Sequence, residues 1–156
     1  MKKEGRITRY SNNGKLELES YYKDNKLHRL DGPADIDYYS DGRVMEERYY
    51  IDNNLHREDG PAIIWYDPNG KPEKEVYYIN NKRHREDGPA EIYYNKSNHV
   101  HIEKYFLNDK LHRLDGAAKI LYNEDGSIKF KTYYIDGKKY QNELMYLMEI
   151  NKIKRY

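Results

Sequence analysis

The sequence predicts an all-β protein: an elongated, twisted antiparallel sheet of 28-residue hairpin repeats, closed at the C-terminus by a short capping helix. Three observations predict it. The pair His-Arg recurs with a constant spacing of 28 residues. Asn-Gly and Asp-Gly dipeptides recur in the same register, and such dipeptides favour the tight turns of β-hairpins. The last residues leave this pattern and are rich in Leu, Met and Glu, which favour helix.

The repeat is most visible in a motif of the form His-Arg-x-Asp-Gly-Pro-Ala. It begins at His28, His56, His84 and His112, and Ala117 replaces the proline in the last copy. Three aromatic columns keep the same spacing and hold 14 of the 19 tyrosines, so tyrosine abundance is a property of the repeat. The columns are Tyr10, Tyr38, Tyr66, Tyr94 and Tyr122; Tyr21, Tyr49, Tyr77, Tyr105 and Tyr133; and Tyr22, Tyr50, Tyr78, Phe106 and Tyr134.

Each repeat is expected to contain one hairpin with a two-residue turn that has positive φ at both central positions. The second turn residues are Gly14, Gly42, Gly70, Asn98 and Gly126. The strand before a turn is expected over about residues 62–66, and the strand after a turn over about residues 44–51. Successive side chains of a strand point to opposite faces, so Tyr49 and Tyr50 should lie on opposite faces of the sheet, one in a core and one on the other surface.

The two ends differ from the repeats. We expect an irregular N-terminal cap over residues 1–9, four and a half repeats over residues 10–140, and a C-terminal cap over residues 141–156. A helix over about residues 142–153 would cover the last strand edge, which otherwise invites aggregation. The alternative is a final strand, because Tyr146, Met148 and Ile150 fall on columns that hold Ala, Ile and Tyr in the repeats.

Composition excludes several classes of protein. The 156 residues include 28 Lys and Arg against 27 Asp and Glu, which argues against a strongly basic nucleic-acid binder. The absence of Cys excludes disulfides, thiolate chemistry and cysteine zinc sites. No stretch approaches the roughly 18 apolar residues of a membrane span. We therefore expect a soluble, cytoplasmic protein without integral membrane association.

The run Tyr77-Tyr78-Ile79-Asn80-Asn81-Lys82-Arg83-His84, followed by a glycine and a new strand, resembles the MORN repeat. It is most similar to the variant that carries His-Arg-x-Asp-Gly-Pro-Ala, found in repeat proteins of phages and giant viruses. The resemblance covers about residues 10–140. It implies a hairpin-repeat architecture and a role in binding. The likeness to phage and antitoxin-like variants further implies inhibition of a host-defence or toxin partner.

Nothing in the sequence predicts an enzyme, a cofactor or a metal site. It has no Gly-x-Ser-x-Gly elbow, phosphate loop, dinucleotide fingerprint or His-Glu-x-x-His motif. Equivalent histidines of adjacent repeats should lie ~10 Å apart, whereas zinc needs its ligands at about 2 Å from one centre. His99 and His101 should share one face of a strand, but no third ligand accompanies them.

Two interpretations of the His-Arg-x-Asp motif remain open. In the structural one, the motif aspartates accept hydrogen bonds from the backbone and from arginine, the glycine adopts a strained turn, and histidine packs between repeats. The aspartates are Asp31, Asp59, Asp87 and Asp115. In the functional one, the exposed histidine, arginine and aromatic groups form a binding surface.

The leading hypothesis is a non-enzymatic protein that binds another protein, because Tyr and Arg are enriched in interface hot spots. One alternative is a protein that sequesters a nucleotide or nucleic acid between aromatic rings of adjacent repeats. Another is a membrane-surface scaffold, as in MORN proteins. The predicted binding residues are Tyr22, Tyr50, Tyr78, Phe106, Tyr134, His28, His56, His84, His112, Arg29, Arg57, Arg85 and Arg113.

Overall fold

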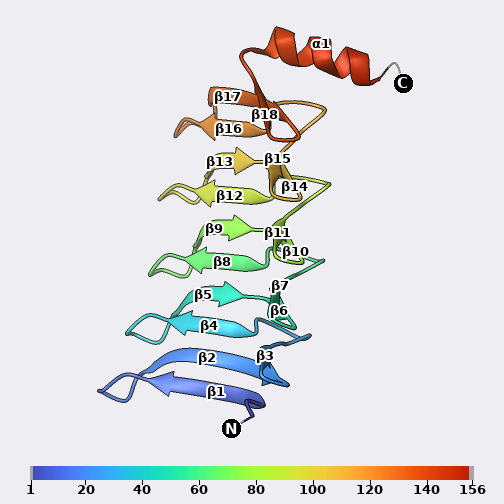
Figure 1. Ribbon diagram of the computed structural model, residues 1–156. Coiled ribbons are helices and arrows are strands. Elements are labelled where there is room, and N and C mark those ends of the chain that lie inside the picture. The colour runs from blue at the N-terminus through green and yellow to red at the C-terminus, as the bar shows by residue number, and fades with distance from the viewer. Residues whose placement is uncertain (1, 155–156) are drawn as a thin grey trace. The chain divides into compact units, whose positions relative to one another are not determined.

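The computed structural model describes residues 2–154 and consists of antiparallel strands followed by one helix (Figure 1). The chain divides into two compact units after Lys82. The long strands of the first unit are β1 (Gly5–Tyr10), β2 (Leu16–Lys23), β4 (Asp35–Tyr38), β5 (Val44–Arg48), β8 (Ile63–Tyr66) and β9 (Pro72–Val76). Those of the second are β12 (Glu91–Tyr94), β13 (Val100–Lys104), β16 (Lys119–Tyr122) and β17 (Ile128–Ile135), followed by the short strand β18 (Lys138–Tyr140) and by α1 (Glu143–Ile153).

Within each unit the long strands are hydrogen-bonded to one another in chain order, as consecutive hairpins require. The predicted fold class, antiparallel hairpin repeats with a C-terminal helix, is therefore confirmed. No helix in residues 2–154 combines the length and the apolar character needed to cross a membrane.

Each repeat also contains a second, smaller hairpin, which the sequence analysis did not predict. Its strands are only two residues long: β3 (Lys26–Leu27), β6 (Tyr50–Ile51), β7 (Asn54–Leu55), β10 (Tyr78–Ile79), β11 (Lys82–Arg83), β14 (Phe106–Leu107) and β15 (Lys110–Leu111). The turn between β6 and β7 has positive φ at both Asp52 (50°) and Asn53 (65°), the conformation of a two-residue hairpin turn. The equivalent turns are Asp24-Asn25, Asn80-Asn81, Asn108-Asp109 and Asp136-Gly137.

The Asn-Gly turns of the large hairpins differ from the prediction. In the first of them Ser11 N–H donates to the Lys15 carbonyl and Gly14 N–H donates to the Ser11 carbonyl. Of these turn residues Gly14 has positive φ, and Asn13 does not. The turn is therefore longer than two residues, with the glycine in the left-handed region and a register shift beside it.

The strand expected over residues 44–51 is interrupted at Tyr49. β5 ends at Arg48, and β6 starts at Tyr50 as part of the small hairpin, where Tyr50 pairs with Leu55. Beyond Arg48 the pairing partner changes, and residues 50 and 51 pair with β7. β2 and β17 run without interruption through the equivalent position.

The N-terminal cap is regular, so the expectation of an irregular segment is wrong from Gly5 onward. Gly5–Tyr10 form β1, which pairs with β2 along its whole length. Before it, Asn25 N–H donates to the Lys3 carbonyl (3.0 Å), which matches the bond from Asn53 N–H to the Leu27 carbonyl (2.9 Å) in the next repeat. The first residues thus accept the same backbone hydrogen bond from the small-hairpin turn that a preceding repeat would accept.

The C-terminal cap is a helix, as predicted, and the alternative of a final strand is wrong. Asn142 is the N-cap and its side chain accepts from Met145 N–H (3.0 Å). Tyr146 and Ile150 face inward and are buried against Tyr133 and Tyr140. Helix and last hairpin therefore share one hydrophobic core.

Candidate binding surfaces

The arginine of the His-Arg-x-Asp motif is held within its own repeat. Arg57 donates from Nε to Asp59 (2.8 Å) and from Nη1 to the Pro61 carbonyl (3.4 Å). Its guanidinium lies 4.0 Å from the centre of the Tyr49 ring, a cation–π contact. The arginines of the first and fourth repeats make the same set of contacts. The arginine column therefore ties the loop to the sheet.

The motif glycine leaves room for this arginine. A Cβ on Gly60 would lie 3.0 Å from Arg57 Cζ, and the equivalent distance at Gly88 is 2.9 Å. These glycines do not have positive φ, so the expected strained turn is wrong. Close approach of the guanidinium explains the glycine instead. The expected hydrogen bond from arginine to the motif aspartate is present.

The Arg57 guanidinium lowers the pKa of Asp59 below the usual range of an aspartate, first by its hydrogen bond and then by its charge. The folded state thus favours the ionised carboxylate, and its stabilising contribution is present above the ordinary pKa and lost as pH falls through the lowered one. We predict that Arg57→Gln raises the Asp59 titration midpoint toward the ordinary value in a carbon-detected NMR titration. Asp31 in the same variant is the control. An unchanged Asp59 midpoint would contradict the pairing.

The histidines contact the small turn of the following repeat. His28 Nδ1 lies 3.0 Å from Asp52 Oδ1 and accepts from Asp52 N–H (3.3 Å), and His112 contacts Asp136 in the same way. His56 Nδ1 lies 3.0 Å from Asn80 Oδ1. The expected packing of histidine between repeats is thus observed. The buried Nδ1 of His84 has no hydrogen-bond partner among the described residues.

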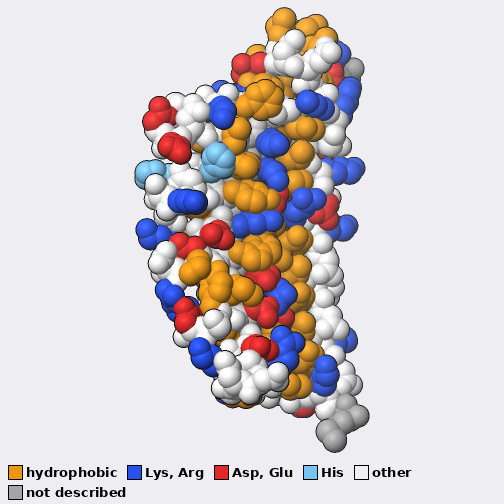
Figure 2. Space-filling model, turned by 90° about the vertical axis from the view of Figure 1, so that its left-hand side faces the viewer, with side chains coloured by type: hydrophobic (Ala, Val, Ile, Leu, Met, Phe, Trp, Pro, Cys, Tyr) orange, Lys and Arg blue, Asp and Glu red, His pale blue; other side chains and the backbone are white. Residues whose placement is uncertain are grey.

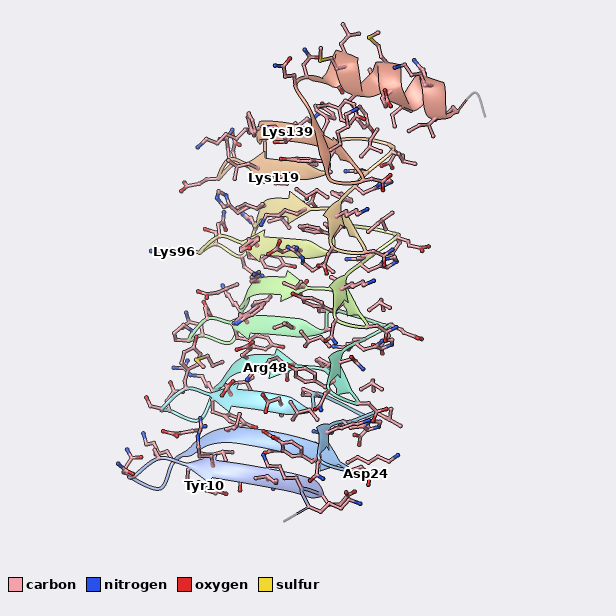
Figure 3. All side chains as sticks on the ribbon, viewed as in Figure 1. Tyr10, Asp24, Arg48, Lys96, Lys119 and Lys139 are labelled. Atoms are coloured by element: carbon pink, nitrogen blue, oxygen red, sulfur yellow. The ribbon has the colours of Figure 1, made fainter. Side chains whose placement is uncertain are left out.

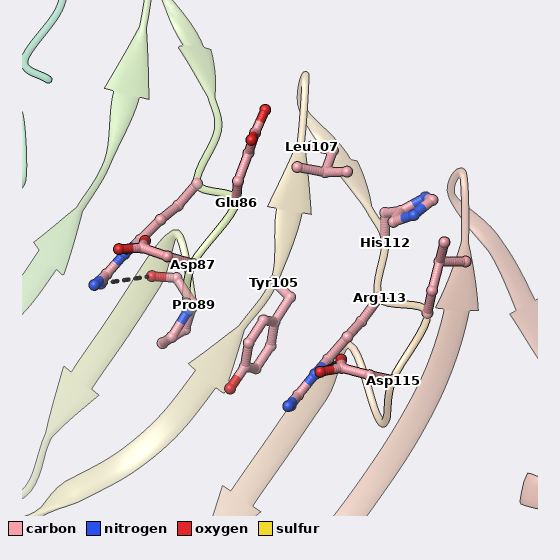
Figure 4. Close-up of a pocket in the computed structure, with 11 residues that line it drawn as sticks. Glu86, Asp87, Pro89, Tyr105, Leu107, His112, Arg113 and Asp115 are labelled. Atoms are coloured by element: carbon pink, nitrogen blue, oxygen red, sulfur yellow. Dashed lines mark hydrogen bonds and ion pairs between the residues drawn. The ribbon is translucent and has the colours of Figure 1, made fainter.

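Two successive motif loops of the second unit enclose a groove of about 650 Å³ (Figure 4). It is lined by the 85–89 loop, by Tyr105 and Leu107, and by the 112–115 loop, with the Asp87 and Asp115 side chains exposed. The groove brings together three of the predicted binding residues, Arg85, His112 and Arg113. One face of the Tyr105 ring is occupied by the Arg113 guanidinium at 3.9 Å.

The aromatic column that was predicted to bind, which contains Tyr50, lies outside this groove. Tyr50 is half-buried near Arg48 and Asp35, and its burial raises its pKa, whereas Tyr49 lies near Glu47 and Arg57. The two columns therefore occupy opposite faces, as expected. Phe106 is buried, with the Arg83 guanidinium 4.0 Å from its ring centre. Tyr22, Tyr78 and Tyr134 are half-buried.

One face of the sheet carries nearly the same residues in every repeat. In the first unit, directly paired residues form the row Glu19, Ile36, Glu47, Ile64 and Glu75. In the second unit the row is Ile92, Glu103, Ile120 and Lys131. The hydroxyl groups of Tyr66 and Tyr122 donate to Glu47 (2.9 Å) and Glu103 (2.8 Å). These recurring contacts explain why the fold requires the same residues at each step.

The opposite face changes from repeat to repeat, and we call it the variable face. In the first unit its two rows are Ser20, Asp35, Arg48, Ile63 and Val76, and Leu18, Asp37, Glu46, Trp65 and Lys74. In the second unit they are Glu91, Lys104, Lys119 and Thr132, and Tyr93, Ile102, Leu121 and Phe130. None of these positions is among the binding residues predicted from the sequence. The sequence feature that could have identified this face is that its columns do not repeat from one 28-residue unit to the next.

The variable face carries both signs of charge next to aromatic rings. Arg48 on β5 (Figure 3) pairs with Asp35 at 2.9 Å and also contacts Asp37. Lys74 lies 4.7 Å from the centre of the Trp65 ring. In the second unit Lys104 donates to Glu91 (3.0 Å) and lies over Tyr93. On the side seen in Figure 2, basic and acidic side chains are likewise interspersed among hydrophobic ones.

Candidate metal ligands are not brought together. Across residues 2–154 there is no group of three or more His, Asp or Glu placed to hold a metal ion. His99 precedes β13 and its backbone N–H donates to Asn95, whereas His101 lies within β13, next to the shift in its pairing with β12.

Two stretches of the chain, residues 3–24 and 63–80, match the model of the MORN repeat variant. They end at equivalent positions of the first and third repeats, Asp24 and Asn80, in the small-hairpin turn. The resemblance to MORN repeats is thus confirmed over these two stretches. No curated protein matches the chain. Similarity to phage and giant-virus proteins stays a prediction.

Proposed function

We propose that this repeat protein is non-enzymatic and binds another protein through its variable face. The observation that carries the proposal is the contrast between the two faces of one sheet. Positions that the repeat architecture requires hold the same residue at each step, as in the Glu and Ile row. The rows of the variable face do not repeat, and Arg48, Trp65 and Lys74 in them are partly exposed, so a partner can contact them. The tyrosines of the Tyr50 column border this face.

A partner with irregular chemistry accounts best for this contrast. A nucleic-acid backbone or a bilayer presents the same chemistry at each step and would favour the same residue in each repeat. A folded protein presents different chemistry along its surface. The mixed charges around Arg48 and the aromatic Trp65 and Tyr93 suit such an interface, where aromatic residues and arginine supply much of the binding energy. The resemblance of the chain to phage and antitoxin-like variants supports a role in which this binding inhibits a host-defence or toxin protein.

The groove beside Tyr105 supports the runner-up, a nucleotide or nucleic-acid sequestering protein, because an aromatic ring and two arginines line it. Its rim carries Glu86, Asp87 and Asp115, which repel phosphate. The sequence predicts that the His and Arg columns bind a protein partner. We assign Arg85, His112 and Arg113 of this groove to the alternative instead, and the variable face to the leading proposal.

The test is affinity purification of the tagged protein from its native cells, with and without nuclease. We expect a protein to co-purify, and we expect Trp65→Ala with Lys74→Ala to reduce its recovery at least tenfold. Leu30→Ala with Lys96→Ala changes an exposed apolar residue and a lysine away from the variable face, and should leave recovery unchanged. Circular dichroism verifies that both variants fold.

Each other outcome counts against the proposal. Undiminished recovery in the variable-face variant would remove that face from the interface. Loss of all bound material after nuclease would favour nucleic acid, and the binding should then weaken steeply with salt. Co-purification with lipid vesicles alone would favour the membrane scaffold.

A further inference from the structure

Helix α1 has a second apolar side that nothing in the described chain covers. Its inward residues, Tyr146 and Ile150, are buried in the core of the last hairpin. On its other sides Leu144, Met145, Leu147 and Met148 are 68%, 49%, 46% and 57% exposed. A helix on a protein surface normally presents polar residues to water. A cluster of exposed large apolar side chains marks an interaction site.

Beside this cluster lies a groove of about 440 Å³ between α1 and β18. Met145, Met148 and Tyr140 provide its apolar lining, and methionine side chains adapt easily to different ligands. Three lysines, Lys138, Lys139 and Lys152, line it together with a single carboxylate, Glu149, which pairs with Lys152 at 3.2 Å. The groove therefore joins an apolar floor to a basic rim.

We propose that this groove binds an acidic amphipathic segment of a partner protein. Apolar side chains of that segment contact Met145 and Met148, and its carboxylates pair with the lysines of the rim. The mode is that of a helix or short peptide seated in a groove by its apolar face. The surface is separate from the variable face, so this proposal goes beyond the function proposed above and does not depend on it.

Charge argues against a second copy of the chain as the occupant. Within the described residues, β18, α1 and its C-cap residue carry Lys138, Lys139, Lys152 and Lys154 against Glu143 and Glu149. Two such surfaces facing each other would oppose lysines to lysines, and like charges in an interface are unfavourable. An acidic partner removes this repulsion.

Shape and charge also argue against a bilayer. A bilayer surface is flat, whereas Tyr140, Met145 and Met148 line a concave groove. Glu149 lines that groove and Glu143 lies at the start of the same helix, so an anionic headgroup layer would meet carboxylates as well as lysines. A peptide can place its carboxylates at the lysines alone.

The experiment measures fluorescence anisotropy of a labelled synthetic peptide with leucines at helical spacing and glutamates elsewhere, titrated with the full chain. We expect saturable binding that weakens with salt. A peptide of the same composition with scrambled leucines, and one with lysine in place of glutamate, should bind at least tenfold more weakly. The first comparison tests whether binding requires an amphipathic segment, and the second tests whether it requires an acidic one.

Two charge-reversal variants locate the site. Lys139→Glu with Lys152→Glu should weaken binding of the acidic peptide at least tenfold. Lys129→Glu with Lys131→Glu makes the same charge change on β17, outside the groove, and should leave the affinity within about twofold. Equal loss in both variants would show only a general charge effect and would overturn the site.

Three other results would overturn the proposal: equal affinity for the acidic and basic peptides, binding to phosphatidylserine vesicles without binding to the peptide, and concentration-dependent dimerisation that α1 variants abolish. None of these results bears on the variable face. Conversely, failure of Trp65→Ala with Lys74→Ala to reduce partner recovery would leave this groove unaffected.

Discussion

Replacing Tyr146 with alanine is expected to lower the free energy of unfolding of the second unit by about 3 to 5 kcal/mol, the usual cost of removing a buried aromatic ring. Tyr146 is 2% exposed, and its ring lies 5.0 Å from that of Tyr133 and 6.2 Å from that of Tyr140. The substitution would leave a cavity in the core that joins α1 to the last hairpin. Urea denaturation followed by circular dichroism measures the loss.

The hydroxyl group of Tyr146 contributes separately. It donates to the Arg113 carbonyl (3.1 Å) and accepts from Gly116 N–H (3.0 Å). Tyr146→Phe keeps the ring but leaves these two backbone groups without their partner, so we expect a loss of about 1 to 3 kcal/mol. Leu144→Ala on the exposed side of α1 is the control and should change stability little. Equal effects of Tyr146→Ala and Leu144→Ala would contradict the assigned core.

The second large effect is expected at the arginine contacts. Arg57→Ala removes two hydrogen bonds and a cation–π contact from a half-buried side chain, so we expect a loss of about 2 to 3 kcal/mol in the first unit. Gly60→Ala should cost about 1 to 3 kcal/mol, because its Cβ would lie 3.0 Å from Arg57 Cζ and displace the guanidinium.

These two substitutions should not be additive. With Arg57 already replaced, Gly60→Ala meets no guanidinium and should cost little, so a double-mutant cycle isolates the contact. Gly116→Ala in the fourth repeat is a graded control, because its closest approach is 3.3 Å and its cost should be smaller. Additive losses at Arg57 and Gly60 would show that the glycine serves another purpose.

The C-terminal helix shows what residue composition can predict and what it cannot. The Leu, Met and Glu content of the last residues predicted a helix, and the helix is present. The reason for its position is tertiary. In the second and fourth repeats Tyr49 and Tyr105 contact the motif arginine. Tyr133 occupies the same column, but Gln141 stands where that arginine would be, and the Tyr146 ring packs there instead.

The turns show the opposite case, because the two-residue turn was predicted at the wrong dipeptides. Asn-Gly predicts the two-residue turn, yet that conformation occurs at Asp52-Asn53 and its equivalents. Asp and Asn adopt positive φ more often than most other non-glycine residues, and these dipeptides recur at the repeat spacing. Attention to that column would have predicted the small hairpin.

The sequence by itself determined the repeat length, the register, the antiparallel hairpins and the helical cap, because each of these depends on local conformation or on periodicity. Only the tertiary structure decided what each column does. A recurring residue indicates a recurring environment but not whether that environment is interior or surface. The folded motif loop placed Arg57 between a ring and a glycine, and strand pairing aligned Asp35, Arg48 and Ile63 in one row. Neighbours in such a row are distant along the chain, so no local pattern records them.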